Sequence, residues 1–164
     1  MTTKYPNTQL PNHPKNSPVV DFEEADSTRG EEEFWANGDD SEPAALHEEI
    51  INGQPYDLEE RTARFGEAII RFAKKIPRGP GNNRLIDQLV GAATSVGANY
   101  CEADEGVSRK DYKKSIGTGK KEARETKFFL RMIATAEVGL KPEARRLWRE
   151  AKELHLIFCS LYRK

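Results

Sequence analysis

The sequence predicts an all-α protein: an antiparallel, up-down-up-down, left-handed four-helix bundle over residues 55–164, preceded by a disordered acidic tail over residues 1–54. Four segments of the bundle carry apolar residues alternately three and four positions apart, as amphipathic helices do. Short glycine- and proline-rich breaks separate them, which favours antiparallel neighbours, and the heptad-like period favours a left-handed twist. The tail holds three Lys/Arg against 12 Asp/Glu, a net charge of −9, whereas the bundle holds 23 against 15, a net charge of +8.

The tail has little that could fold alone. Residues 1–20 contain four prolines, which lack a backbone donor and restrict the preceding residue. Residues 21–54 are acidic and poor in large apolar side chains, so burial cannot offset the chain entropy. A short helix fits around residues 42–51. Phe34 and Trp35 stand out in the acidic stretch, either as incidental aromatics or as a docking motif that folds on a partner.

Capping signals delimit the first two predicted helices. Asp57 with Glu60 three residues later is a capping-box arrangement, so the first helix starts there. It ends at residues 77–81, where two prolines and two glycines predict a tight loop. The second helix covers about residues 82–105, and Gly106 suits the position that follows a helix.

The third and fourth helices are delimited in the same way. Ser108 with Asp111 predicts the cap of a third helix over about residues 109–138, whose apolar stripe holds its register for more than four heptads. Gly139 ends this helix. Pro142 then occupies the first position of the fourth helix, where the missing donor of proline costs nothing.

Several classes of protein are disfavoured. No apolar run reaches the roughly 18–20 residues that span a bilayer, and the N-terminus has no apolar signal-peptide core. The two cysteines, Cys101 and Cys159, have no metal-type spacing and form no disulfide framework. A di-iron bundle needs Glu-x-x-His pairs, and none of the three histidines follows a glutamate by three. We therefore expect a soluble cytoplasmic protein without metal or cofactor.

One glycine-rich segment weakly resembles a phosphate-binding loop. Gly117-Thr118-Gly119-Lys120-Lys121 lacks the preceding strand and the spacing that such a loop requires. It lies within the stripe of the third helix. Its glycines are therefore interpreted as positions where a neighbouring helix approaches closely.

One cluster of polar residues falls near the predicted core. Asn99 lies on the apolar stripe of the second helix, and a buried amide needs hydrogen-bond partners. The sequence favours a structural polar network that fixes helix register, and a ligand or catalytic site is the alternative. The candidate members are Arg61, Ser95, Asn99, Glu102, Glu122 and Glu125.

The third and fourth helices are densely basic. The candidate nucleic-acid-binding residues are Lys113, Lys114, Lys120, Lys121, Arg124, Lys127, Arg131, Arg145 and Arg149. They form either a solvated face with intramolecular ion pairs or a surface for a phosphate backbone. Binding would not depend on base sequence, because the sequence places no aromatic or amide side chain among the cations.

Several segments resemble the 23S rRNA-intervening sequence protein family, also called the four helix bundle protein family. They are Asp57–Thr62, Phe65, Phe72, Gln88–Leu89, Ser95–Ala103, Ser108–Tyr112 and Lys121–Thr126. The resemblance covers about residues 55–162, and the tail has no counterpart. Members occur widely in bacteria, and some are encoded in insertions within the large ribosomal RNA gene.

The resemblance implies a four-helix protomer that assembles into a ring-like homopentamer. A related branch includes the accessory variability determinant of diversity-generating retroelements, a basic pentameric barrel that binds nucleic acid and a reverse transcriptase. The resemblance implies no enzymatic activity. Phe128 and Phe129 stand where the family usually has Tyr-Trp, and Gly117 and Gly119 interrupt a segment that usually suits a helix better.

Three functions follow as hypotheses. The first is a non-enzymatic, homo-oligomeric scaffold that binds RNA or DNA through the third and fourth helices. The second is a protein–protein adaptor that docks through its acidic tail and binds no nucleic acid. The third is an enzyme that uses Asn99, Glu102 and Glu122.

Overall fold

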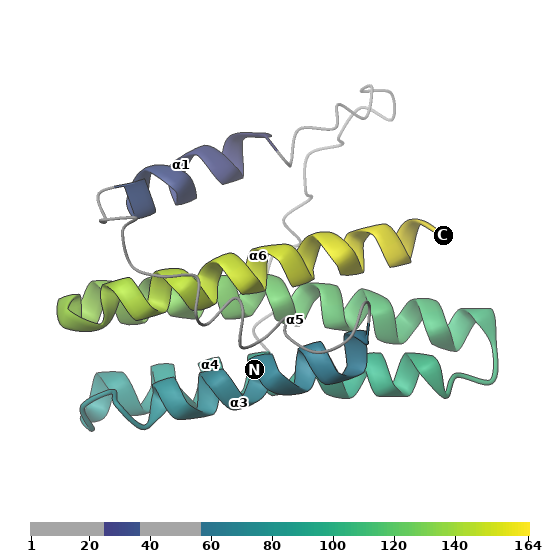
Figure 1. The fold of residues 1–164 in the computed structure, drawn as a ribbon, viewed down its shortest axis with the longest axis horizontal. Helices are drawn as coiled ribbons and strands as arrows, with labels where there is room; N and C mark the ends of the chain where they lie inside the picture. Colours follow the sequence, from purple (N-terminus) through teal and green to yellow (C-terminus); the bar gives the residue numbers. More distant parts are fainter. Residues whose placement is uncertain (1–24, 37–56) are drawn as a thin grey trace, which may run out of the picture. The chain divides into compact units, whose positions relative to one another are not determined.

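The structure is a computed structural model that describes residues 25–36 and 57–164 (Figure 1), and every regular element within these residues is a helix. The elements are α1 (Ala25–Ala36), α3 (Leu58–Ala73), α4 (Pro80–Asp104), α5 (Arg109–Ala136), the 3-10 helix η1 (Val138–Leu140) and α6 (Lys141–Arg163). The all-α prediction is therefore confirmed for the described residues. The short helix predicted at 42–51 lies outside them.

The chain divides into two compact units, Met1–Asn37 and Gly38–Lys164. The first unit contains α1, and the second contains α3 to α6. The boundary predicted between residues 54 and 55 lies outside the described residues and stays a prediction.

The helix α1 lies in the segment for which the sequence analysis predicted no ordered structure. Glu31, Glu32 and Glu33 are good helix formers, and this local propensity favours a helix despite the acidic composition. The rings of Phe34 and Trp35 pack edge to face, with centroids 4.8 Å apart. Trp35 is 2% exposed. The hypothesis that Phe34 and Trp35 form a docking motif for a partner stays a prediction.

The predicted caps of α3 and α5 are confirmed. The Asp57 carboxylate accepts a hydrogen bond from the Glu60 backbone N–H at 3.0 Å. The Ser108 hydroxyl accepts one from the Asp111 backbone N–H at 3.1 Å. Each cap satisfies a backbone donor that the helix itself leaves without a partner, and it thereby fixes where the helix starts.

Some helix ends differ from the predictions by about half a turn to one turn. The helix α3 ends at Ala73, although its apolar pattern continues to the buried Ile76. The helix α4 begins at Pro80, because proline is well suited to the first turn of a helix. The helix α5 ends at Ala136, and η1 then leads directly into α6.

The helices α3, α4, α5 and α6 lie side by side (Figure 1), with α4 and α6 packed against α5, and α3 packed against α4 and α6. Their predicted apolar stripes supply the core. The largest fully buried side chains include Phe65, Ile69, Phe72, Leu89, Val96, Ile116, Leu130, Ile133, Leu154 and Phe158. None of the described helices combines the length and the apolar character needed to cross a membrane.

Candidate functional site

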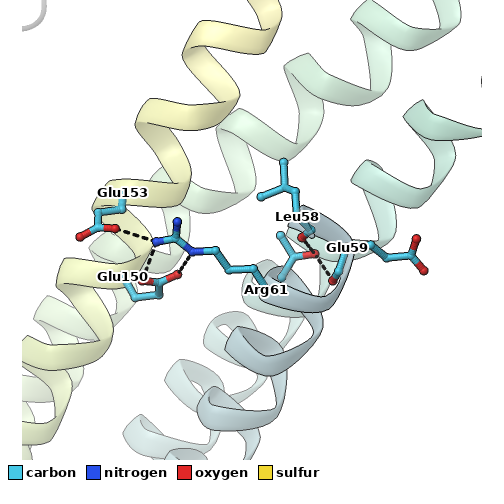
Figure 2. Close-up of polar contacts among 6 residues, drawn as sticks. Leu58, Glu59, Arg61, Glu150 and Glu153 are labelled. Carbon is cyan, nitrogen blue, oxygen red and sulfur yellow. Dashed lines mark hydrogen bonds and ion pairs between the residues drawn. The ribbon is translucent and has the colours of Figure 1, made fainter. Parts of the chain in front are cut away.

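Two features of the second unit could carry a function: a partly buried ion-pair cluster between α3 and α6, and the basic surface of α5 and α6. In the first, Arg61 extends from α3 toward two glutamates of α6 (Figure 2). Its Nε and Nη2 donate to the two carboxylate oxygens of Glu150 at 2.7 and 2.9 Å. The same Nη2 donates to Glu153 at 2.6 Å.

Burial distinguishes the two glutamates. The side chain of Glu150 is 2% exposed, whereas that of Glu153 is 46% exposed. The hydrogen bonds and negative charges, with Glu150 first, outweigh partial desolvation and raise the pKa of Arg61 above its ordinary value. The guanidinium therefore stays charged, and its two-pronged contact with Glu150 fixes α6 against α3.

Arg61 does not join the polar residues of α4 with which the sequence analysis grouped it. The Asn99 amide donates to the backbone carbonyl of Ser95, one turn earlier in the same helix, at 2.8 Å. Among the described residues, no hydrogen bond connects Asn99 with Arg61. Within the described residues, the amide nitrogen therefore finds its partner inside α4.

The remaining members of the proposed network also lie apart. Glu102 accepts a hydrogen bond from the Ser115 hydroxyl of α5, at 3.4 Å. Glu122 and Glu125 make no side-chain hydrogen bond within the described part of the chain. Partial burial and, to a smaller extent, the negative charge of Glu125 raise the pKa of Glu122. In the described ranges, no three His, Cys, Asp or Glu side chains are grouped so as to hold a metal ion.

Sequence reasoning missed Glu150, the most buried carboxylate of the ion-pair cluster. One signal could have indicated it. Glu150 follows Leu147 by three residues and precedes Leu154 by four, which is the spacing of a core position. The next residue, Ala151, follows Leu147 by four and precedes Leu154 by three, and it is also buried. A charged residue at this spacing indicates a paired side chain at the edge of the core.

The second feature combines lysines of α5 with aromatic rings of α6. Lys113 and Lys120 are seven residues apart and lie over the same ring, with their Nζ atoms 5.9 and 5.0 Å from the centroid of Tyr162. One heptad further, the Nζ of Lys127 lies 5.2 Å from the centroid of Trp148. Lys152 of α6 approaches the same tryptophan ring to 5.5 Å.

These contacts correct the sequence analysis, which placed no aromatic side chain among the cations. The lysines and the rings belong to different helices, so the local sequence around the lysines does not show them together. Trp148 and Tyr162 are fourteen residues apart, which is two heptads. They therefore recur on one side of α6 at the same period as the lysines on α5.

The other candidate cations vary in exposure. Lys114, Lys121, Arg124 and Arg149 are exposed, while Arg131 and Arg145 are partly buried. Lys113 and Lys120 are partly buried as well, and Lys127 is buried. The basic surface of α5 and α6 thus consists of exposed cations beside lysines that are held over aromatic rings.

The glycines within this surface permit close contact between α5 and α6, as the sequence analysis interpreted them. A Cβ atom on Gly119 would overlap the Phe158 ring and lie 2.8 Å from its Cδ1. A Cβ atom on Gly117 would lie 3.1 Å from Cε2 of Tyr162. Both glycines lie inside α5, so the segment is not a loop that leads from a strand into a helix.

Comparison with known proteins identifies the second unit. The sequence profile of the 23S rRNA-intervening sequence protein family matches residues 56–159. A crystal structure from Bacteroides thetaiotaomicron, described as a protein with unknown function from the S23 ribosomal protein family, superposes with a TM-score of 0.59. It is 21% identical, and the match covers 65% of this chain and 99% of that chain. No curated protein sequence matches the chain.

Proposed function

Because the chain belongs to the 23S rRNA-intervening sequence protein family, we propose that it is a non-enzymatic helical scaffold that forms homo-oligomers and binds RNA or DNA without sequence preference. The observation that carries the proposal is the basic surface of α5 and α6, in which three lysines of α5 lie over two aromatic rings of α6. Phosphate-backbone binding requires clustered Lys and Arg on one face, and base sequence plays no part in it.

The proposed protomer is an antiparallel, left-handed four-helix bundle. The turns between its helices are short, at residues 74–79, 105–108 and 137–140. Each helix packs against two others in the order α3, α4, α5, α6 and back to α3. Exposed apolar side chains, among them Phe128 of α5 and Leu156 of α6, support association of several copies. The resemblance to the family favours five copies.

The structure also supports a scaffold over an enzyme. An enzyme would have to bring Asn99, Glu102 and Glu122 together. Within the described residues, Asn99 and Glu102 make separate hydrogen bonds, and the Glu122 side chain makes none. Partial burial and a neighbouring carboxylate raise the pKa of Glu122. Such a shift occurs at structural residues as well as at catalytic ones.

The first prediction concerns salt. Full-length protein should retard a labelled RNA at low ionic strength, and log K should fall linearly with log salt because bound phosphates release counterions. Lys120→Gln should reduce the slope by about 0.7–0.9 for the phosphate contact that it removes. Fluorescence anisotropy at several salt concentrations measures both quantities.

A matched control for Lys120→Gln is Lys74→Gln, which removes the same charge from the exposed end of α3. It should leave the slope close to that of the unmodified protein. Equal slope changes in the two variants would show that only net charge matters. Absence of RNA binding at low salt would contradict the proposal and would favour the adaptor hypothesis.

The second prediction concerns the acidic tail. Residues 1–54 carry a net charge of −9 and residues 55–164 a net charge of +8, so we propose that the tail competes with nucleic acid for the basic surface. Deleting residues 1–54 should tighten RNA binding, most strongly at low salt, where the attraction is least screened. Circular dichroism of the shortened chain checks that its helices persist. Unchanged affinity would count against competition by the tail.

A further inference from the structure

We propose that the Tyr162 ring is a stacking platform for an unpaired base, so that the basic surface of α5 and α6 prefers single-stranded nucleic acid. This inference rests on the proposed function and specifies its ligand. Proteins that bind single strands without sequence preference combine a cationic surface with aromatic side chains on which bases stack. Tyr162 and its two lysines bring these two features together at one place.

Tyr162 is held in position from one side and accessible from another. The Cδ2 and Cε2 edge of its ring lies against Gly117 of α5. A Cβ atom added at Gly117 would lie 3.5 Å from Cδ2 and 3.1 Å from Cε2 of the tyrosine ring. The residue nevertheless retains 42% exposure. Lys113 and Lys120 lie one turn before and one turn after Gly117 on α5. The ring is therefore supported by the backbone of one helix and flanked by two ammonium groups.

The chain around Tyr162 adds positive charge. Nη2 of Arg109, at the start of α5, donates to the backbone oxygen of Lys164 at 2.7 Å, which joins the start of α5 to the residue after α6. Arg163 and Lys164 follow Tyr162 directly and are exposed. A phosphate next to a base on the ring would thus meet cations from both helices.

The energies favour an exchange of partners at the ring. A lysine over an exposed aromatic ring is held weakly. A base stacked on an aromatic side chain is held more strongly. Lysine has a flexible four-carbon stem, so Lys113 and Lys120 can leave the ring for the adjoining phosphates. The base then gains the ring surface while each ammonium keeps an electrostatic partner.

A duplex cannot make the same exchange. Its bases are stacked on one another and paired, so their faces are not available to a side chain on the protein surface. Its phosphates remain accessible to the lysines. The binding of both forms of nucleic acid should therefore depend on salt. Only the affinity for the single strand should depend on the tyrosine ring.

The experiment compares a labelled single-stranded RNA with the duplex that it forms with its complement, using full-length protein and the variants Tyr162→Ala and Tyr162→Phe. Tyr162→Ala should weaken single-strand binding roughly 5- to 150-fold, the equivalent of about 1–3 kcal/mol, and leave duplex binding unchanged. Its slope of log K against log salt should also stay unchanged, because stacking releases no counterions. Tyr162→Phe keeps the ring and should bind as the unmodified protein does.

A third variant separates the loss of stacking from a loss of folding. Tyr162→Leu keeps an apolar side chain against Gly117 but has no aromatic face, so it should lose the same single-strand affinity while its thermal melting stays close to that of Tyr162→Phe. Equal effects of Tyr162→Ala on single strand and duplex, or no effect on either, would overturn the stacking inference and leave backbone binding intact. Failure of the unmodified protein to bind either RNA would overturn the proposed function itself.

Discussion

Arg61→Met should lower the free energy of unfolding by roughly 3 kcal/mol, near the lower end of the range for breaking a buried ion pair. Methionine preserves the aliphatic stem and removes the charge. Glu150, at 2% exposure, loses two charge-assisted hydrogen bonds and must keep its carboxylate in the protein interior. Arg61 itself retains 21% exposure, which is why the loss should not reach the upper end of the range. Urea denaturation followed by circular dichroism measures the change.

Two further variants separate this loss from general damage to α6. Glu153→Ala removes the exposed partner of Arg61 and should cost less than about 1 kcal/mol. In the Arg61→Met/Glu150→Gln double variant, a neutral amide replaces the buried carboxylate, so the double variant should be more stable than Arg61→Met alone. If Arg61→Met and Glu153→Ala cost the same, burial of Glu150 does not govern the energy of the cluster.

Gly119→Ala should destabilise the protein by about 2 kcal/mol. The new methyl group would overlap the Phe158 ring, which is fully buried between α5 and its neighbours. Overpacking of this kind costs up to about 3 kcal/mol because rotamers and backbone must shift. Alanine recovers about 1 kcal/mol of helix propensity relative to glycine, which gives the smaller net value. The midpoint of thermal or urea unfolding measures it.

Gly91→Ala is the matched control. Gly91 lies in the interior of α4 and is exposed. Apart from the backbone of α4 itself, no atom of the described residues lies within 4 Å of the Cβ atom that alanine would add. The same substitution there should stabilise the protein by about 1 kcal/mol. The difference between the two variants, about 3 kcal/mol, isolates the contact with Phe158. Two glycines that respond alike would contradict a steric role for Gly119.

The sequence predicted well what depends on local chemistry. The caps formed by Asp57 and Ser108 were predictable because a short polar side chain before an amphipathic segment satisfies a backbone donor in any tertiary context. The core was predictable because spacings of three and four place residues such as Phe65 and Leu130 on one face of a helix. The family was predictable from several short segments of residues 55–162, and the profile match over residues 56–159 confirms it.

What the sequence did not predict depends on partners from distant parts of the chain. Arg61 and Glu150 are separated by 89 positions, and nothing near Arg61 indicates which carboxylate it meets. Tyr162 lies over lysines more than forty residues earlier. The register between α5 and α6 determines that contact, and close packing of Gly119 against Phe158 helps to set the register. A pattern within one helix contains no information about the register between two.

The helix α3 begins beside the last turns of α6. Leu58, in the first turn of α3, packs against the same core cluster as Leu161 of α6, together with Tyr100 and Tyr112. The acidic residues before position 57 are therefore covalently attached at the end of the helices that carries Tyr162. The competition proposed above would be intramolecular, because the acidic segment and the basic surface belong to one chain. Dilution of the protein would not relieve it, whereas one proteolytic cut ahead of Leu58 would.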